Sequence, residues 1–164
     1  MTMVTSDASE AWVQEIYDAV VAHVMQSGYF QRVNSAEATR SPTSAGLYAD
    51  IWINTIESVG AMSGLSVSAA RLMFTIRTYM TLNVRNPDLI DPKMVRAVSG
   101  LMRQYHDDFD FGGIIRNVDL FGTYGVGLIA FSGYMTNMEN TEKYRTFDIM
   151  VPCLVNDVWP QNVG

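Results

Sequence analysis

The densest group of side chains that could do chemistry is the run His106-Asp107-Asp108-Phe109-Asp110. Three carboxylates and an imidazole could bind a divalent cation or act as general acid and base. The run has neither the twelve-residue ligand spacing of an EF-hand nor its closing glutamate. It follows a predicted helix, where carboxylates oppose the helix dipole. We therefore interpret it as a solvated turn that could face a basic partner.

The other two reactive side chains, His23 and Cys153, have no neighbour in the sequence that would complete a metal site or a catalytic pair. His23 lies on the apolar side of a predicted helix, and no second histidine lies within four residues of it. A pair of metal ligands on that helix is excluded, so we expect a buried, hydrogen-bonded histidine. Cys153 is the only cysteine and sits in the apolar run 149–155, which predicts a small buried side chain. One cysteine allows no intrachain disulfide and no cysteine-based zinc site.

The glycines of 122–127 match neither a dinucleotide-binding fingerprint nor a P-loop, and they predict a turn. The run 64–68 starts like a nucleophile elbow but ends in serine instead of glycine. We therefore expect no catalytic residue, no cofactor-binding residue, no metal ligand and no cofactor. The chain is predicted not to be an enzyme.

Length and composition favour a single domain over residues 1–164. The chain has 48% hydrophobic and 17% charged residues, which is enough for a real core. The net charge is −6, and the 11 lysines and arginines are scattered, which argues against tight DNA binding by a monomer. The sequence opens without a signal-peptide pattern, and no apolar stretch approaches the about 18 residues of a membrane span. We expect synthesis in a cytoplasm and no membrane partner.

Hydrophobic periodicity predicts two amphipathic helices. The first covers 9–26 and ends at a serine–glycine pair. The second begins with Asp91 as N-cap and Pro92 at the first helical position, and it runs to about Tyr105. Its apolar stripe consists of Met94, Val95, Val98, Leu101, Met102 and Tyr105.

The remaining segments predict strands, and the order of elements predicts an α+β fold with a mostly antiparallel sheet and both helices on one face. Pro152 lies within the last strand, so we expect an edge position or a bulge there. Residues 1–8 and 159–164 are expected to be flexible or partner-bound ends. The predicted strands are 29–34, 48–57, 65–82, 114–120, 127–135 and 144–156, with a loop at 35–47 and a hairpin turn at 60–64.

Ten short stretches form an ordered pattern over most of the chain. They are SGYFQRVN (27–34), WIN (52–54), AMSGLS (61–66), SAARL (68–72), IDPKM (90–94), LM (101–102), DFDFGG (108–113), RNVDL (116–120), GY (133–134) and VPCLVNDVW (151–159). Together they resemble the tail terminator proteins of long-tailed, siphovirus-type bacteriophages, in particular those that infect actinobacteria. None of the stretches is a chemical signature by itself, so the resemblance lies in the overall pattern.

The resemblance implies a structural virion protein at the head–tail junction, assembled in the host cytoplasm. Such proteins form a hexameric ring on the head-proximal end of the tail tube, where the ring ends tube polymerisation and docks the head–tail connector. The implied partners are further copies of the chain, the tail tube protein and the connector protein. DNA would pass non-specifically through the ring, and an acidic chain suits a channel that does not hold DNA. The resemblance implies no cofactor and no catalytic residue.

Two other classes of function stay open. One is a head–tail joining protein or a tail tube protein of the same particle, although the two helices argue against a tube subunit, which is mostly β with a long hairpin loop. The other is a small-molecule enzyme or binding domain, which would need a pocket with converging polar groups. We expect the 35–47 loop, the 60–64 turn and the C-terminal tail to make the assembly contacts.

Overall fold

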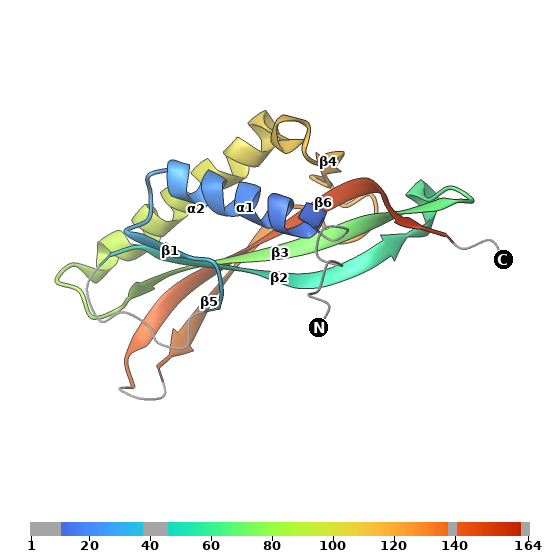
Figure 1. Cartoon of the computed structure of the whole chain (residues 1–164). Helices are drawn as coiled ribbons and strands as arrows, with labels where there is room; N and C mark the ends of the chain where they lie inside the picture. The colour runs from blue at the N-terminus through green and yellow to red at the C-terminus, as the bar shows by residue number, and fades with distance from the viewer. Residues whose placement is uncertain (1–10, 38–45, 138–140, 162–164) are drawn as a thin grey trace, which may run out of the picture.

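The structure is a computed structural model that describes residues 11–37, 46–137 and 141–161. A curled six-stranded sheet carries two α-helices on one of its faces (Figure 1). All strand pairs are antiparallel except one parallel pair at an edge. The predicted α+β fold, with a mostly antiparallel sheet, is confirmed.

The sheet has the strand order β1-β2-β3-β6-β4, and β5 also pairs with β6. The helices are α1 (Ala11–Gln26) and α2 (Ile90–Asp107). The strands are β1 (Arg32–Asn34), β2 (Tyr48–Val59), β3 (Val67–Thr81), β4 (Asn117–Val118), β5 (Ile129–Thr136) and β6 (Lys143–Pro160). Short 3-10 helices cover Gly60–Met62, Pro87–Leu89 and Phe111–Gly113.

The antiparallel pair of β3 and β6 forms the centre of the sheet. Its register runs from Val67 opposite Pro160 to Thr81 opposite Tyr144. The predicted hairpin of β2 and β3 lies on one side of this pair. On the other side, β6 is long enough to pair with two strands. Its residues 143–150 pair with β5, and its residues 153–154 pair with β4.

Pro152 lies in this central strand and pairs with Met73 without a register shift, so the predicted edge position or bulge was wrong. Its carbonyl accepts a hydrogen bond from the backbone N–H of Asp119 at 2.8 Å, so this residue's backbone polar groups face the β4 side. On that side β5 has ended at Met150 and β4 begins its pairing at Cys153. The missing proline N–H therefore falls in the gap between two partner strands, which explains why the sheet tolerates it.

The core lies between the helices and one face of the sheet. Ile16, Val20 and Val24 of α1 are buried against this face. Successive strand residues alternate between faces, so Phe74, Ile76 and their neighbours in register point toward the helices. Leu72, Ile149, Val151, Cys153, Leu101 and Tyr105 belong to the same cluster.

The start of α2 differs from the prediction. The helix begins at Ile90 after the 3-10 turn, so Asp91 is not its N-cap. Asp91 lies in the first turn, where a negative charge is favourable, and its Oδ1 accepts a hydrogen bond from Arg145 Nε at 3.0 Å. Val95 was also misplaced, because it is 50% exposed and Ala97 is buried in the stripe.

Two of the predicted strands are shorter in the structure than the sequence indicated. The strand expected at 114–120 shrinks to β4, because Gly112 and Gly113 take positive φ angles in the turn before it. The strand expected at 29–34 keeps only its last three residues.

The C-terminal end is more ordered than predicted as far as the structure describes it. Trp159 belongs to β6, and its ring centroid lies 5.9 Å from that of Trp12. The backbone N–H of Gln161 donates to the carbonyl of Ser66 at 2.6 Å. Residues 159–161 are thus tied to the β2–β3 hairpin, whereas 1–8 and 162–164 lie outside the described residues.

Leu72→Ala should lower the free energy of unfolding by about 3–5 kcal/mol, because it leaves a cavity under both helices. Leu65→Ala is the matched control, since Leu65 is 91% exposed in the same hairpin. We expect it to change stability by about 0.5 kcal/mol or less. Urea unfolding of both variants at one protein concentration measures the difference, and similar losses for the two would contradict the assigned core.

Candidate interaction surfaces

The structure brings His23 into contact with the 106–110 run, which contains the other histidine. His23 Nε2 lies 3.0 Å from Asp108 Oδ2, and Asp108 Oδ1 accepts a hydrogen bond from the backbone N–H of Gly112 at 3.0 Å. His23 also packs against the rings of Tyr105 and Phe111. The contact fastens α1 to the turn that follows α2. His23 is hydrogen-bonded, as the sequence predicted, but its side chain is 16% exposed and so is only partly buried.

The other polar side chains of the 106–110 run point elsewhere. His106 and Asp107 are exposed, and the ring of His106 lies 6.1 Å from that of Phe121. Within the described ranges, no three His, Cys, Asp or Glu side chains stand close enough to hold a metal ion. The run therefore consists of the last two residues of α2 and a turn at 108–110, where the sequence predicted a turn throughout, and its carboxylates do not converge.

Cys153 is fully buried on the helix side of β6. Burial raises the pKa of its thiol, which keeps the sulfur protonated at neutral pH. This matches the prediction of a small buried side chain.

The sequence did not reveal a buried ion pair beneath the glycine-rich turn. Arg71 and Asp119 are both buried, and Arg71 Nη2 lies 3.2 Å from Asp119 Oδ2. Asp119 also accepts hydrogen bonds from the backbone N–H groups of Thr123 and Tyr124, at 2.8 and 3.0 Å. Arg71 in turn donates to the carbonyl of Val126. The only feature of the sequence that hinted at this ion pair was Arg71, a charged residue in the middle of the long β-prone run 65–82.

The same ion pair explains the glycine at 125. Its φ is +153°, and a Cβ placed there would lie 2.9 Å from the Arg71 guanidinium. The turn can therefore wrap over Arg71 only with glycine at this position.

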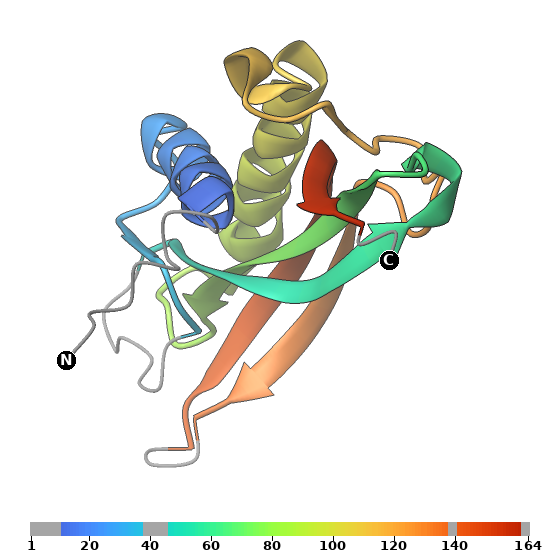
Figure 2. The same cartoon turned by 45° about the vertical axis from the view of Figure 1, so that its right-hand side comes forward.

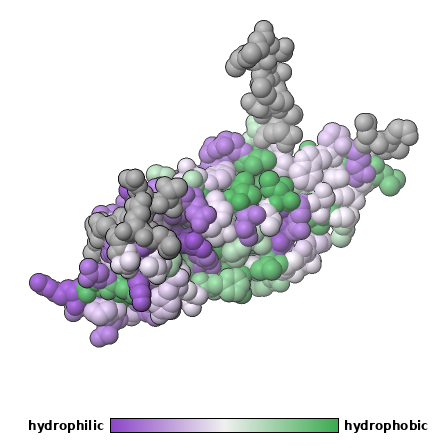
Figure 3. Space-filling view, turned by 90° about the horizontal axis from the view of Figure 1, so that it is seen from below, coloured by the Kyte–Doolittle hydropathy of each residue, from purple (hydrophilic) through white to green (hydrophobic). Residues whose placement is uncertain are grey.

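The face of the sheet opposite the helices carries two rows of side chains across four strands. One row consists of Trp52, Thr75, Met150 and Ile129, and the next of Asp50, Arg77, Asp148 and Phe131. Arg77 makes two hydrogen bonds of 2.9 Å to Asp148, which raise the pKa of the guanidinium, and it lies 5.2 Å from the Trp52 ring centroid. Figure 3 views the molecule from this side and shows hydrophobic side chains gathered over its middle.

β5 is the most exposed part of the sheet. Within the described part of the chain it pairs only with β6, and no helix covers it (Figure 2). Phe131 is 53% exposed on one face of β5, and Tyr134 is 69% exposed on the other. Natural monomers usually protect an edge strand of this kind by charge, by bulges or by a covering element. This edge is therefore a candidate for contact with another chain.

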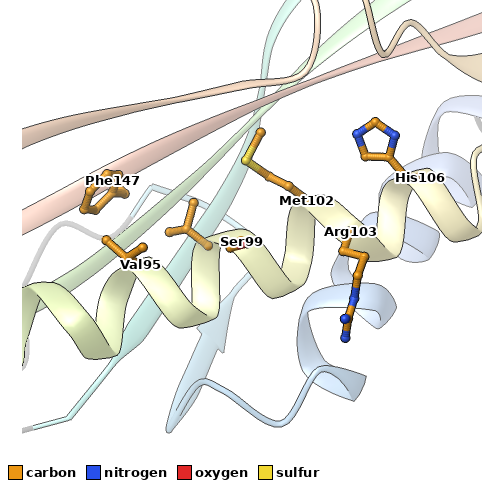
Figure 4. Close-up of a pocket in the computed structure, with 7 residues that line it drawn as sticks. Val95, Ser99, Met102, Arg103, His106 and Phe147 are labelled. Atoms are coloured by element: carbon orange, nitrogen blue, oxygen red, sulfur yellow. The ribbon is translucent and has the colours of Figure 1, made fainter.

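A groove of about 400 Å³ lies between α2 and β6, on the side of α2 that faces β5. Val95, Val98, Met102 and Phe147 give it apolar walls. Its polar side chains do not converge, because Arg103 and His106 point in different directions (Figure 4). The groove suits an apolar side chain from another protein better than a polar substrate.

The chain matches no protein-family model and no curated protein. Of the helices that the structure describes, none has the length and apolar character that crossing a membrane requires. Function is therefore inferred from the surfaces above and from the ordered sequence pattern.

Asp119→Ala should lower the free energy of unfolding by up to about 3–5 kcal/mol, because the buried Arg71 would lose its buried partner and be left with the half-exposed carboxylate of Glu57, 3.5 Å away. Asp107→Ala makes the same change in charge at an exposed position and should alter stability by about 0.5 kcal/mol or less. Chemical denaturation of both variants tests this. A small effect for both would show that the ion pair does not hold the 119–127 turn.

Cys153 should resist alkylation by iodoacetamide in the folded protein at neutral pH and react fully in urea. The reason is that burial both blocks access and raises the thiol pKa, so that little thiolate is present. Mass spectrometry of the labelled protein gives the extent of reaction. Rapid, complete labelling of the folded chain would contradict the assigned position.

Proposed function

We propose that this chain is a structural ring subunit that caps the head-proximal end of a bacteriophage tail tube, as tail terminator proteins do. The observation that carries the proposal is the edge strand β5. It exposes aromatic side chains on both faces, and none of the described residues pairs with its second backbone edge. Such an edge favours assembly with another protein chain.

The arrangement of the sheet favours a ring over a symmetric dimer. Its two edges differ, because β1 is a three-residue parallel strand and β5 an eight-residue antiparallel strand. A contact that joins unlike edges of successive copies is heterologous, and it forms a closed ring when the rotation between subunits closes. The proposed ring is a hexamer, with the tail tube protein and the head–tail connector as its neighbours.

The sequence pattern supplies the specific place in the particle. The resemblance to tail terminators implies a sheet with helices on one side, and the observed fold agrees with that expectation. The net charge of −6 suits a channel through which DNA slides without binding. The proposed location is the virion, at the junction of head and tail.

A tail tube subunit is the second candidate. It is favoured by the β5–β6 hairpin, which extends away from the helices (Figure 1), because tube subunits carry a long hairpin. It is disfavoured by the two amphipathic helices.

Electron microscopy of lysates tests the proposal, using a phage in which a stop codon interrupts this reading frame. We expect overlong or ragged tails without heads, beside DNA-filled heads without tails. A plasmid copy of the wild-type gene should restore normal virions.

Each other outcome points to a different role. Tails of normal length that fail to join heads would favour a joining protein. The absence of any tube would favour a tube subunit. Whole, infectious virions would overturn a structural role and return attention to an enzyme or binding domain.

A further inference from the structure

We propose that the ring closes by docking of α1 of one copy against α2 and its groove on the next copy. The acidic outer side of α1 would face the basic outer side of α2. The inference rests on the proposed function, because it names the surfaces through which the ring subunits meet. The occupant of the α2 groove is thus a second copy of this chain.

The exposed side of α1 is acidic. Glu15 and Asp18 lie on it, and the helix contains no lysine or arginine. Ala11 and Ala22 lie on the same side, where small side chains permit another helix to come close. Met25 follows near the end of this stripe and is 62% exposed, so it offers an apolar contact on the acidic side of the helix.

The exposed side of α2 is basic. Lys93, Arg96 and Arg103 are all exposed and make no ion pair within the described residues. Two carboxylates lie on the same helix. Asp91 already pairs with Arg145, and the exposed Asp107 leaves three positive charges and one negative charge on the outer side. A surface with several unpaired positive charges on one helix is complementary to the acidic stripe of α1.

The apolar parts of the two surfaces also match. On α1, Met25 follows Asp18 by seven residues, which is about 10 Å along a helix. On α2, the groove residues Val95 and Met102 have the same separation, and Arg96 and Arg103 follow each of them by one position. Met25 can therefore enter the groove while Asp18 meets an arginine two turns away.

α1 and the groove beside α2 lie on different sides of the helix layer, as contacts with two different copies require. Figure 2 shows α1 at one side of the helix layer and β5 at the other, with α2 between them. Tyr29 packs on α2 at Gly100, on the side of that helix turned toward α1. The groove lies on the opposite side of α2 and includes Arg103, whereas Lys93 and Arg96 line a hollow beside Tyr29. One copy can therefore offer α1 to one neighbour and the groove to another.

Charge reversal tests the pairing with two variants. Glu15→Lys/Asp18→Lys gives a chain whose two helices are both basic, and Arg96→Glu/Arg103→Glu gives one whose helices are both acidic. Each variant alone should associate about tenfold or more weakly than wild type, because like charges meet at every interface. An equal mixture should restore rings, because each interface then joins opposite charges.

Arg85→Glu/Arg116→Glu is the control for the Arg96→Glu/Arg103→Glu variant, since it makes the same charge change at exposed positions outside both helices. Circular dichroism shows whether each variant is folded. Sedimentation velocity at several concentrations measures association, and native mass spectrometry of the mixture should show rings with equal numbers of the two variants. Added salt should weaken association of the wild-type chain.

If the purified wild-type chain forms rings only on tail tubes, the same variants are expressed from plasmids in cells infected by the phage whose reading frame carries the stop codon. Each single variant should then give overlong tails, and co-expression of both should give normal ones. Assembly of both variants as readily as the control, or a mixture no better than its components, would overturn the proposed interface while leaving the ring function intact. Normal virions without any copy of the gene would overturn the ring function itself.

Discussion

The long antiparallel ladder between β3 and β6 is the interaction on which the rest of the fold depends. Its register places Leu72, Phe74, Ile149 and Val151 on the face where both helices bury their apolar sides. Long-range pairing of this kind costs chain entropy before it yields contacts, so it needs a continuous run of β-prone residues on both strands. Because β6 is longer than any single partner on its outer side, β4 and β5 share it, and the proline falls between them.

The same geometry creates the buried ion pair. The chain between β4 and β5 must cross from one partner segment of β6 to the next, and Asp119 holds that crossing to Arg71 of β3. A buried pair is a weak source of net stability, since both charges lose their hydration. Its value lies in fixing one path for a glycine-rich turn, because Asp119 accepts two backbone N–H groups and Arg71 occupies the space beside Gly125.

Assembly is favoured by what the fold leaves uncovered. Two helices cover the part of the sheet near β2, β3 and β6, whereas β5 extends beyond them with Phe131 and Tyr134 exposed. The outward charges also differ between the helices, because α1 carries Glu15 and Asp18 whereas α2 carries Lys93, Arg96 and Arg103 beside Asp107. A monomer gains nothing from this separation, whereas successive copies in a ring could pair the two signs.

The sequence by itself determined the α+β class, both helices, the β2–β3 hairpin and the burial of Cys153, because these depend on local periodicity and on short-range turns. Only the tertiary structure decided that β6 is central despite Pro152, that Asp91 pairs with Arg145, and that Asp119 meets Arg71 across 48 residues. Side-chain period reports which residues face the core, but it carries no information on which strands become neighbours. The candidate surfaces follow from that neighbour order, since an edge is exposed only when no other strand pairs with it.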